Sequence, residues 1–246
     1  LDREHPISIK ATFLGAHAIP KKYRERPEEY VELICNEMIP QVAEEKLADF
    51  VDVFCEKGYF SVDQTEKIME IGKDHGLKPK IHVNQFNSIG GIQAAIRSEA
   101  LTVDHLEVMT ETDFKDLENS EVMPVALPSC SYFLSIPYTP AREIIDRGMS
   151  LAIATDFNPG STPSGNMNFV LSSACIKMRM TPEEAINAAT LNGAYAMNLS
   201  KSHGSITKGK VANLILTQEI PSIGFLPYAF GSNLIEKVMI RGEFIS

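Results

Sequence analysis

The sequence predicts an α/β fold built on parallel strands, followed by a small antiparallel β unit. Short apolar or β-branched runs alternate with amphipathic helices six times between residues 9 and 155. This alternation is typical of parallel βαβ units. From Gly204 onward, GSITKGKVANLILTQ and EKVMIRGEFIS instead alternate apolar and polar residues, with glycine at the turns, which is typical of antiparallel strands. We therefore expect one domain over residues 1–200 and a second unit over 201–246.

The six expected strands are short runs rich in Val, Ile, Leu, Phe and Ala, as buried parallel strands require. They are predicted at 9–15, 51–55, 79–83, 102–105, 123–127 and 151–155.

The helices between these strands and after the last one are predicted from capping residues and periodicity. Ser61 with Gln64, and Thr181 with Glu184, each have the spacing of a capping box. Thr139 is the expected cap of a helix that has proline in its first turn. The remaining helices are predicted from apolar periodicity at 27–46, 92–98 and 111–118.

Six strand–helix units fit either a doubly wound sheet or most of a (β/α)8 barrel. A dinucleotide-binding sheet needs a glycine-rich turn after its first strand. The turn here reads GAHAIP, so that fingerprint is absent.

Composition excludes several classes of function. The chain of 246 residues has a formal net charge of −9 and a pI of about 5.2, which argues against nucleic acid as a partner because phosphate binding needs clustered Lys and Arg. No apolar run approaches the roughly 20 residues that span a bilayer. The four cysteines form no CxxC pair, and the first residues contain no apolar signal segment. These features predict a cytoplasmic protein with free thiols.

Polar residues gather where the predicted strands end, which is where barrel enzymes place their chemistry. The strand-end residues are His17, Glu56, His82, His105, the turn Pro128–Ser131 and Asp156, so three of the six histidines in the chain stand at strand ends. A histidine that ends a buried strand can bind a metal ion, or it can be a hydrogen-bonded core residue. A buried carboxylate such as Asp156 needs a cation or several donors, or else caps the next turn.

Two further features stay open from the residues alone. Glu56 is either a surface carboxylate or one that supports a ligand. The turn Asn158–Pro163 follows Asp156 directly, and its backbone N–H groups and short side chains can hold an anion or an amide, although turns of this composition are common.

The order of strand-end histidines and aspartate resembles the amidohydrolase superfamily. A closer resemblance is to the imidazolonepropionase family, and it covers nearly the whole chain. It is carried by TFLGAHAIP (12–20), VDVFCEKGYFS (51–61), KIHVNQF (80–86), DHLE (104–107), ATDFNPGS (154–161) and TPEEA (181–185).

The resemblance implies a (β/α)8 TIM barrel of the metal-dependent amidohydrolase type. The chain would supply only strands three to eight and the C-terminal part of a small β-sandwich. The family's HxH pair, which provides two more metal ligands, would lie in a missing N-terminal segment. Zinc or iron would be held by His82 and Asp156. An isolated fragment with two ligands is expected to be inactive, since catalytic zinc sites typically have three.

The resemblance also implies the remaining roles. His17 would contact the substrate, Gln85 would lie near the substrate and the metal water, and His105 would stabilise the oxyanion. Asp156 would act as base and then acid. Asn158, Gly160 and Ser161 would hold the propionate end, with Ser161 standing where many members have Thr.

The implied reaction is hydrolysis of 4-imidazolone-5-propanoate to N-formimidoyl-L-glutamate in histidine degradation, by a homodimer. Two alternatives remain. A purine or pyrimidine deaminase of the same superfamily would need no residues that bind a propionate group. An inactive fragment could serve as a metal-free binding module, and metal analysis would separate it from the enzyme.

Overall fold

The computed structural model describes residues 4–245, and the predicted α/β fold is confirmed. Six strands, β1 to β6, follow one another in chain order in one sheet, and β1–β2, β2–β3, β3–β4 and β5–β6 pair in parallel. A separate three-stranded antiparallel sheet lies near the C-terminus. The chain forms two compact units, one from Lys10 to Pro124 and one from Val125 onward together with the segment up to Ile9.

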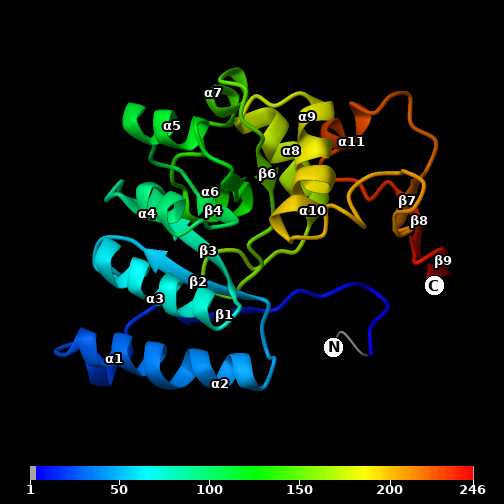
Figure 1. Ribbon diagram of the computed structural model, residues 1–246. Coiled ribbons are helices and arrows are strands. Elements are labelled where there is room, and N and C mark those ends of the chain that lie inside the picture. Colours follow the sequence, from blue (N-terminus) through cyan, green and yellow to red (C-terminus); the bar gives the residue numbers. More distant parts are fainter. Residues whose placement is uncertain (1–3, 246) are drawn as a thin grey trace. The chain divides into compact units, whose positions relative to one another are not determined.

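The first unit contains four parallel strands with helices between them (Figure 1). Its strands are β1 (Thr12–Ala16), β2 (Phe50–Cys55), β3 (Lys78–Val83) and β4 (Thr102–His105). Its helical segments are η1 (Lys21–Tyr23), α1 (Pro27–Leu33), η2 (Ile34–Met38), α2 (Ile39–Glu44), α3 (Val62–Asp74), α4 (Gly91–Arg97) and α5 (Glu111–Glu118).

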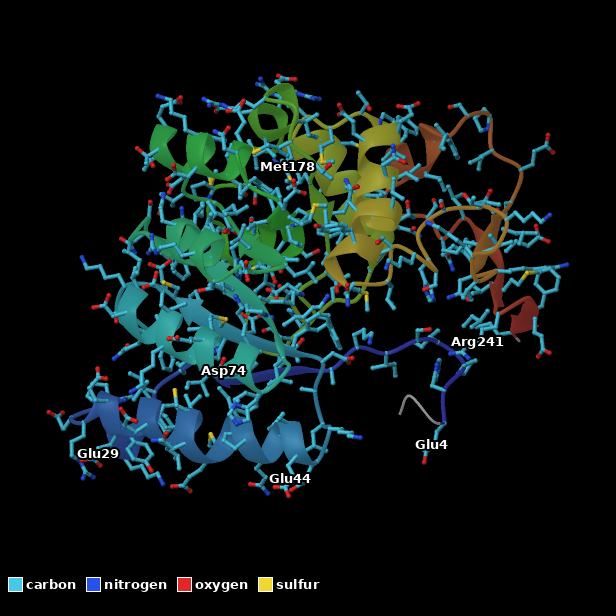
Figure 2. The ribbon with its side chains drawn as sticks, viewed as in Figure 1. Glu4, Glu29, Glu44, Asp74, Met178 and Arg241 are labelled. Carbon is cyan, nitrogen blue, oxygen red and sulfur yellow. The ribbon has the colours of Figure 1, made fainter. Side chains whose placement is uncertain are left out.

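The helix predicted over 27–46 is continuous but changes its hydrogen-bond pattern. It runs as α1, a π-helical turn η2 and α2. Pro40 stands in the first turn of α2 and has no N–H, so it cannot donate the regular helical hydrogen bond to the preceding turn. The turn before it is π-helical, with hydrogen bonds between residues five apart. Figure 2 shows Glu29 and Glu44 on the outer side of this segment, and both residues are exposed.

Helix α3 packs closely on strand β2. At Gly72 an added Cβ would lie 2.5 Å from Val51 Cγ1, so the two backbones approach more closely than a side chain would allow. The predicted capping box is present, since Gln64 N donates to Ser61 Oγ over 3.2 Å and Ser61 N donates to Gln64 Oε1 over 3.0 Å. A glycine inside the helix and a cap at its start therefore set the position of α3 on the sheet.

The second unit contains the end of β5 (Met123–Ala126), the short β6 (Ala152–Ile153) and a set of helices. These are α6 (Pro128–Leu134), α7 (Ala141–Asp146), α8 (Met167–Lys177), α9 (Pro182–Asn187), η3 (Ala188–Asn192) and α10 (Gly193–Ala196). The capping box of Thr181 and Glu184 is present as predicted.

Two local predictions in this unit were wrong. The expected turn Pro128–Ser131 is the first turn of α6, because proline at the first position of a helix loses no intrahelical bond and fixes a helical φ. The N-cap of α7 is Pro140 rather than Thr139, and no side chain caps this helix.

The C-terminal sheet consists of β7 (Leu214–Thr217), β8 (Ile235–Ile240) and β9 (Glu243–Ile245), with the short helix α11 (Phe225–Tyr228) between the first two. Its antiparallel pairing is as predicted. Strand β7 starts later than the sequence pattern suggests. Gly204 and Gly209 adopt left-handed φ values of 91° and 94°, so the residues before β7 form turns instead of a strand. The domain boundary at residue 200 stays a prediction. No helix in residues 4–245 combines the length and the apolar character needed to cross a bilayer.

Candidate functional site

Three histidines meet at the carboxyl ends of strands in the first unit. His17 follows β1, His82 lies in β3 and His105 is the last residue of β4. The ring centroids of His82 and His105 are 5.4 Å apart, and those of His17 and His82 are 6.1 Å apart. The structure thus brings together three of the residues that the sequence singled out, because parallel strands end at the same edge of the sheet.

Phe54 of β2 completes this cluster of rings. It stacks on His17 with a centroid distance of 5.4 Å and an interplanar angle of 17°, and its ring lies 6.2 Å from that of His82. The register of the sheet explains the contact, since Phe54 is the Cα partner of His82. Phe54 and His105 are buried, whereas His17 is exposed, so the ring cluster opens to solvent at His17.

His82 also belongs to a group of ionisable residues that can hold a metal ion. One ligand atom from each of Asp52, His82 and Asp104 lies within 4.8 Å of the others. Asp104 is the Cα partner of His82, and its buried Oδ1 atom has no hydrogen-bond partner among the described residues. An imidazole next to carboxylate oxygens is a donor set that suits zinc or iron, so His82 has the surroundings of a metal-binding histidine.

Asp52 was missed by the sequence analysis. It is almost fully buried, and its Oδ1 lies 2.9 Å from His82 Nδ1. The available signal was an acidic residue inside the apolar run FVDVFC, where an unpartnered carboxylate would be costly. Asp104 carried the same signal in TVDH.

The backbone at His105 is strained. His105 and Leu106 have φ values of 88° and 66°, which are unfavourable for residues with a Cβ and cost on the order of 1–3 kcal/mol each. Leu106 is fully buried and its N–H donates to Val83 O over 3.2 Å, so packing and pairing hold the turn. His105 Nδ1 lies 3.5 Å from Oε1 of the buried Glu107. Strain of this kind is often stored where a side chain must be aimed at a ligand.

Gln85 lies in the loop that follows β3 and is largely buried. Its neighbour Asn84 has a left-handed φ of 55°. Asn84 Nδ2 donates to Oδ2 of the buried Asp113 over 3.2 Å, and Ser88 Oγ donates to the same atom over 2.8 Å. The loop that carries Gln85 is therefore held by hydrogen bonds to α5.

Cys55, at the end of β2, is a packing residue. It is fully buried, and burial is the main cause that raises the pKa of its thiol. Burial likewise raises the pKa of the Cys35 and Cys175 thiols. The thiolate is therefore disfavoured at each of these cysteines, in contrast to a nucleophilic cysteine.

In the second unit, the turn after Asp156 is organised by Asn158. Asn158 Nδ2 donates to Asp156 O over 2.7 Å, and Asn158 Oδ1 accepts from Gly160 N and Ser161 N over 2.9 and 2.8 Å. Thr162 is buried, and its Oγ1 lies 3.5 Å from Asp156 Oδ2. The turn is therefore a preformed set of short polar groups next to the Asp156 carboxylate, and the side-chain amide of Asn158 lies at its centre.

The predicted site residues thus fall into two groups, one in each unit. His17, His82, Gln85 and His105 belong to the first unit, and Asp156, Asn158, Gly160 and Ser161 belong to the second. Ligation of one metal ion by both His82 and Asp156 stays a prediction.

A family model described as the amidohydrolase family matches residues 7–245. The chain belongs to the amidohydrolase family. A curated protein named imidazolonepropionase from Flavobacterium johnsoniae is 69% identical over 245 residues, and one from Christiangramia forsetii is 64% identical over the same length. These matches cover 100% of this chain and 60% of each relative, so the chain spans about three fifths of the length of these curated relatives.

Solved structures with similar folds support the same architecture. An adenosine deaminase from Xanthomonas campestris with bound zinc matches with a TM-score of 0.76 and 18% identity, over 99% of this chain and 62% of that one. A triazine hydrolase variant matches with a TM-score of 0.74 and 14% identity, over 96% of this chain and 60% of that one. At these identities the likeness is one of fold.

Proposed function

We propose that the protein containing this chain is an imidazolonepropionase, which hydrolyses 4-imidazolone-5-propanoate to N-formimidoyl-L-glutamate. The observation that carries the proposal is the identity of 63–69% to three proteins of that name over the length of the chain. The cluster of His17, His82 and His105 supports it, since it supplies imidazoles at one edge of the sheet for metal and substrate.

The metal ion, zinc or iron, would be held by His82 and Asp156 together with ligands from outside this chain. When bound, it would act as a Lewis acid and lower the pKa of a water molecule toward ~7. Asp52 accepts a hydrogen bond from His82 Nδ1, so the hydrogen of the neutral ring sits on that nitrogen and the lone pair on Nε2.

The other residues would act on the substrate directly. Asp156 accepts a proton as water attacks the ring carbonyl and later returns a proton to the departing ring nitrogen. His105 donates to the carbonyl oxygen as negative charge develops there, and its strained backbone fixes the ring for this task. His17, stacked on Phe54, presents a flat face and a polar edge to the imidazolone ring.

The turn Asn158–Ser161 would bind the propionate end of the substrate. The N–H groups of Gly160 and Ser161 point at Asn158 Oδ1. A substrate carboxylate would therefore compete with this oxygen for the two donors, and the charge of the carboxylate favours the exchange. We also propose a cytoplasmic homodimer, by analogy with the family.

The test is turnover by the complete, metal-loaded protein. Incubation with 4-imidazolone-5-propanoate should deplete the imidazolone and yield N-formimidoyl-L-glutamate, and a chelator should abolish this reaction. A parallel panel of adenosine, guanine and cytosine, followed by ammonia release, is expected to show no reaction. Deamination without imidazolone turnover would overturn the proposal in favour of a deaminase, and a protein without stoichiometric metal would overturn the metal-dependent chemistry.

A further inference from the structure

Glu56, the residue directly after β2, is one of the most deeply buried charged residues described, with 1% of its surface exposed. It resolves the alternative that the sequence left open, because it is not a surface carboxylate. Its two oxygens accept four hydrogen bonds from the described residues. Oε1 accepts from Lys57 N over 2.9 Å and from Asn87 Nδ2 over 2.9 Å. Oε2 accepts from Phe86 N over 3.0 Å and from Asn87 N over 3.2 Å.

These bonds determine what Glu56 can do. An ionised carboxylate offers about four lone-pair positions, and here four donors occupy them. Among the described residues, these bonds use the acceptor positions that a metal ion or a substrate would need. Glu56 therefore differs from Asp104, whose buried Oδ1 has no partner among the described residues.

Three of the four donors come from Phe86 and Asn87, so Glu56 ties the end of β2 to the loop that follows β3. Gln85 immediately precedes the two anchored residues. On the other side of Gln85, Asn84 is held by Asp113 through its side chain, and Asn84 O accepts from Val108 N over 2.9 Å. Gln85 is thus fixed on both sides. On the C-terminal side Glu56 holds the two residues next to Gln85, and Asp113 accepts from Ser88 Oγ one residue further on.

We propose that Glu56 is a positioning residue that sets the place of the Gln85 side chain in the substrate pocket. The proposal rests on the proposed function, in which Gln85 lies near the substrate and the metal water. In the variant Glu56→Gln, one acceptor oxygen becomes an NH2 group. This group faces N–H donors, so at least one bond becomes a repulsion and the loop moves. A shift of about 1 Å at a reacting group is enough to cost on the order of 10²-fold in rate.

The test is a double-mutant cycle in the complete protein, with Glu56→Gln, Gln85→Ala and the pair. We expect Glu56→Gln to lower kcat by about 10- to 100-fold and to change KM by less than about 3-fold, because the orientation of a reacting group is affected more than binding. In the Gln85→Ala background the same substitution should lower kcat by less than about 2-fold, since its target is gone. Glu37→Gln, which removes an exposed carboxylate of the same unit, is the matched control and should leave kcat unchanged.

A merely structural role would give a different result. The two losses would then multiply in the double variant, and this outcome overturns the proposal. If Glu56→Gln fails to fold, Glu56→Asp serves instead, because it keeps the charge and shortens the reach. Glu56→Asp should lower kcat less than Glu56→Gln does, and this loss should likewise nearly disappear in the Gln85→Ala background.

Amide hydrogen exchange at Phe86 and Asn87 separates this inference from the proposed function. The exchange needs no substrate, and Glu56→Gln should speed it by at least about tenfold, since it breaks the bonds that protect these amides. Unchanged exchange would overturn the role of Glu56 in holding the loop. A wild-type protein that does not turn over imidazolone would overturn the proposed function and the catalytic link, while the exchange still decides whether Glu56 holds the loop.

Discussion

Asp52 and His82 form a buried pair across two adjacent parallel strands, with Asp52 Oδ1 2.9 Å from His82 Nδ1. The carboxylate accepts the hydrogen bond, so Nδ1 carries the hydrogen. The pair fixes both the tautomer and the direction of the ring before any ligand binds. A carboxylate behind a histidine is a common arrangement at metal sites, where it raises the basicity of the ligating nitrogen.

Loss of this pair should weaken metal binding. We expect Asp52→Asn to lower the affinity for zinc by about 10- to 100-fold, because an amide neither fixes the tautomer nor raises the basicity of the ring. Competition of the complete protein with a chelator measures the affinity. Asp74→Asn removes an exposed carboxylate at the end of α3 and should have no effect. Equal zinc affinities for the Asp52 variant and the wild type would contradict the role of the pair.

Removal of the His105 ring should lower the rate rather than metal binding. We expect His105→Ala to reduce kcat by about 10²- to 10³-fold, the usual effect of losing one oxyanion donor. His75→Ala is the matched control, since His75 is exposed at the C-cap of α3 and bonds Ile71 O. Steady-state kinetics together with metal analysis test this. A variant that loses its metal but keeps kcat when reloaded would show that His105 is a metal-site residue instead.

The close approach of α3 to β2 predicts that Gly72→Ala lowers the free energy of unfolding, whereas helix propensity alone would predict an increase. Alanine is favoured over glycine inside a helix by about 1 kcal/mol, but a Cβ at position 72 would lie 2.5 Å from Cγ1 of the fully buried Val51. Overpacking of this kind costs about 1–3 kcal/mol. We expect Gly72→Ala to lower the free energy of unfolding by about 1 kcal/mol, measured by urea denaturation. The exposed control Glu70→Ala should change it little, and a more stable Gly72→Ala variant would contradict the packing argument.

Glu184 should make part of the stability dependent on pH. It accepts two hydrogen bonds of 2.9 Å from Arg142, and these are the main cause that lowers the pKa of Glu184 from its usual value of 4.5. A carboxyl whose pKa is lower in the folded state contributes stability above its unfolded pKa, and this contribution disappears as the pH falls through the folded value.

We therefore expect Glu184→Gln to lower the free energy of unfolding at pH 7 by about 1 kcal/mol, a figure that allows for solvent screening of a partly exposed pair. Below pH 4.5 the difference from wild type should shrink. Thermal unfolding across this range measures it, with Glu183→Gln of the same helix turn as control. If the stability difference between Glu184→Gln and the wild type stays constant down to pH 3, the ionisation of Glu184 does not contribute to stability.

Local signals predicted most of the fold. The β4 strand and helix α5 have the predicted bounds, and the capping boxes at Ser61 and Thr181 are formed. These elements depend on residues within one turn or one strand. The errors arose where neighbouring signals competed, as at Pro128, which suits both a turn and the first position of a helix.

The site was predicted less completely, for a physical reason. His17, His82 and His105 could be singled out because each ends a strand, and parallel strands end together. Asp52 lies two positions before the strand partner of His82, so its role depends on the register between β2 and β3. That register is set by packing across the sheet and leaves no local mark beyond an aspartate in an apolar strand.

The central proposal is that His82 and Asp156 bind one metal ion. A crystal structure of the complete protein with zinc, located by anomalous scattering at the zinc edge, tests it most directly. We expect a single ion about 2.0–2.2 Å from His82 Nε2 and from a carboxylate oxygen of Asp156. An ion held by Asp52, His82 and Asp104 while Asp156 points elsewhere would contradict it.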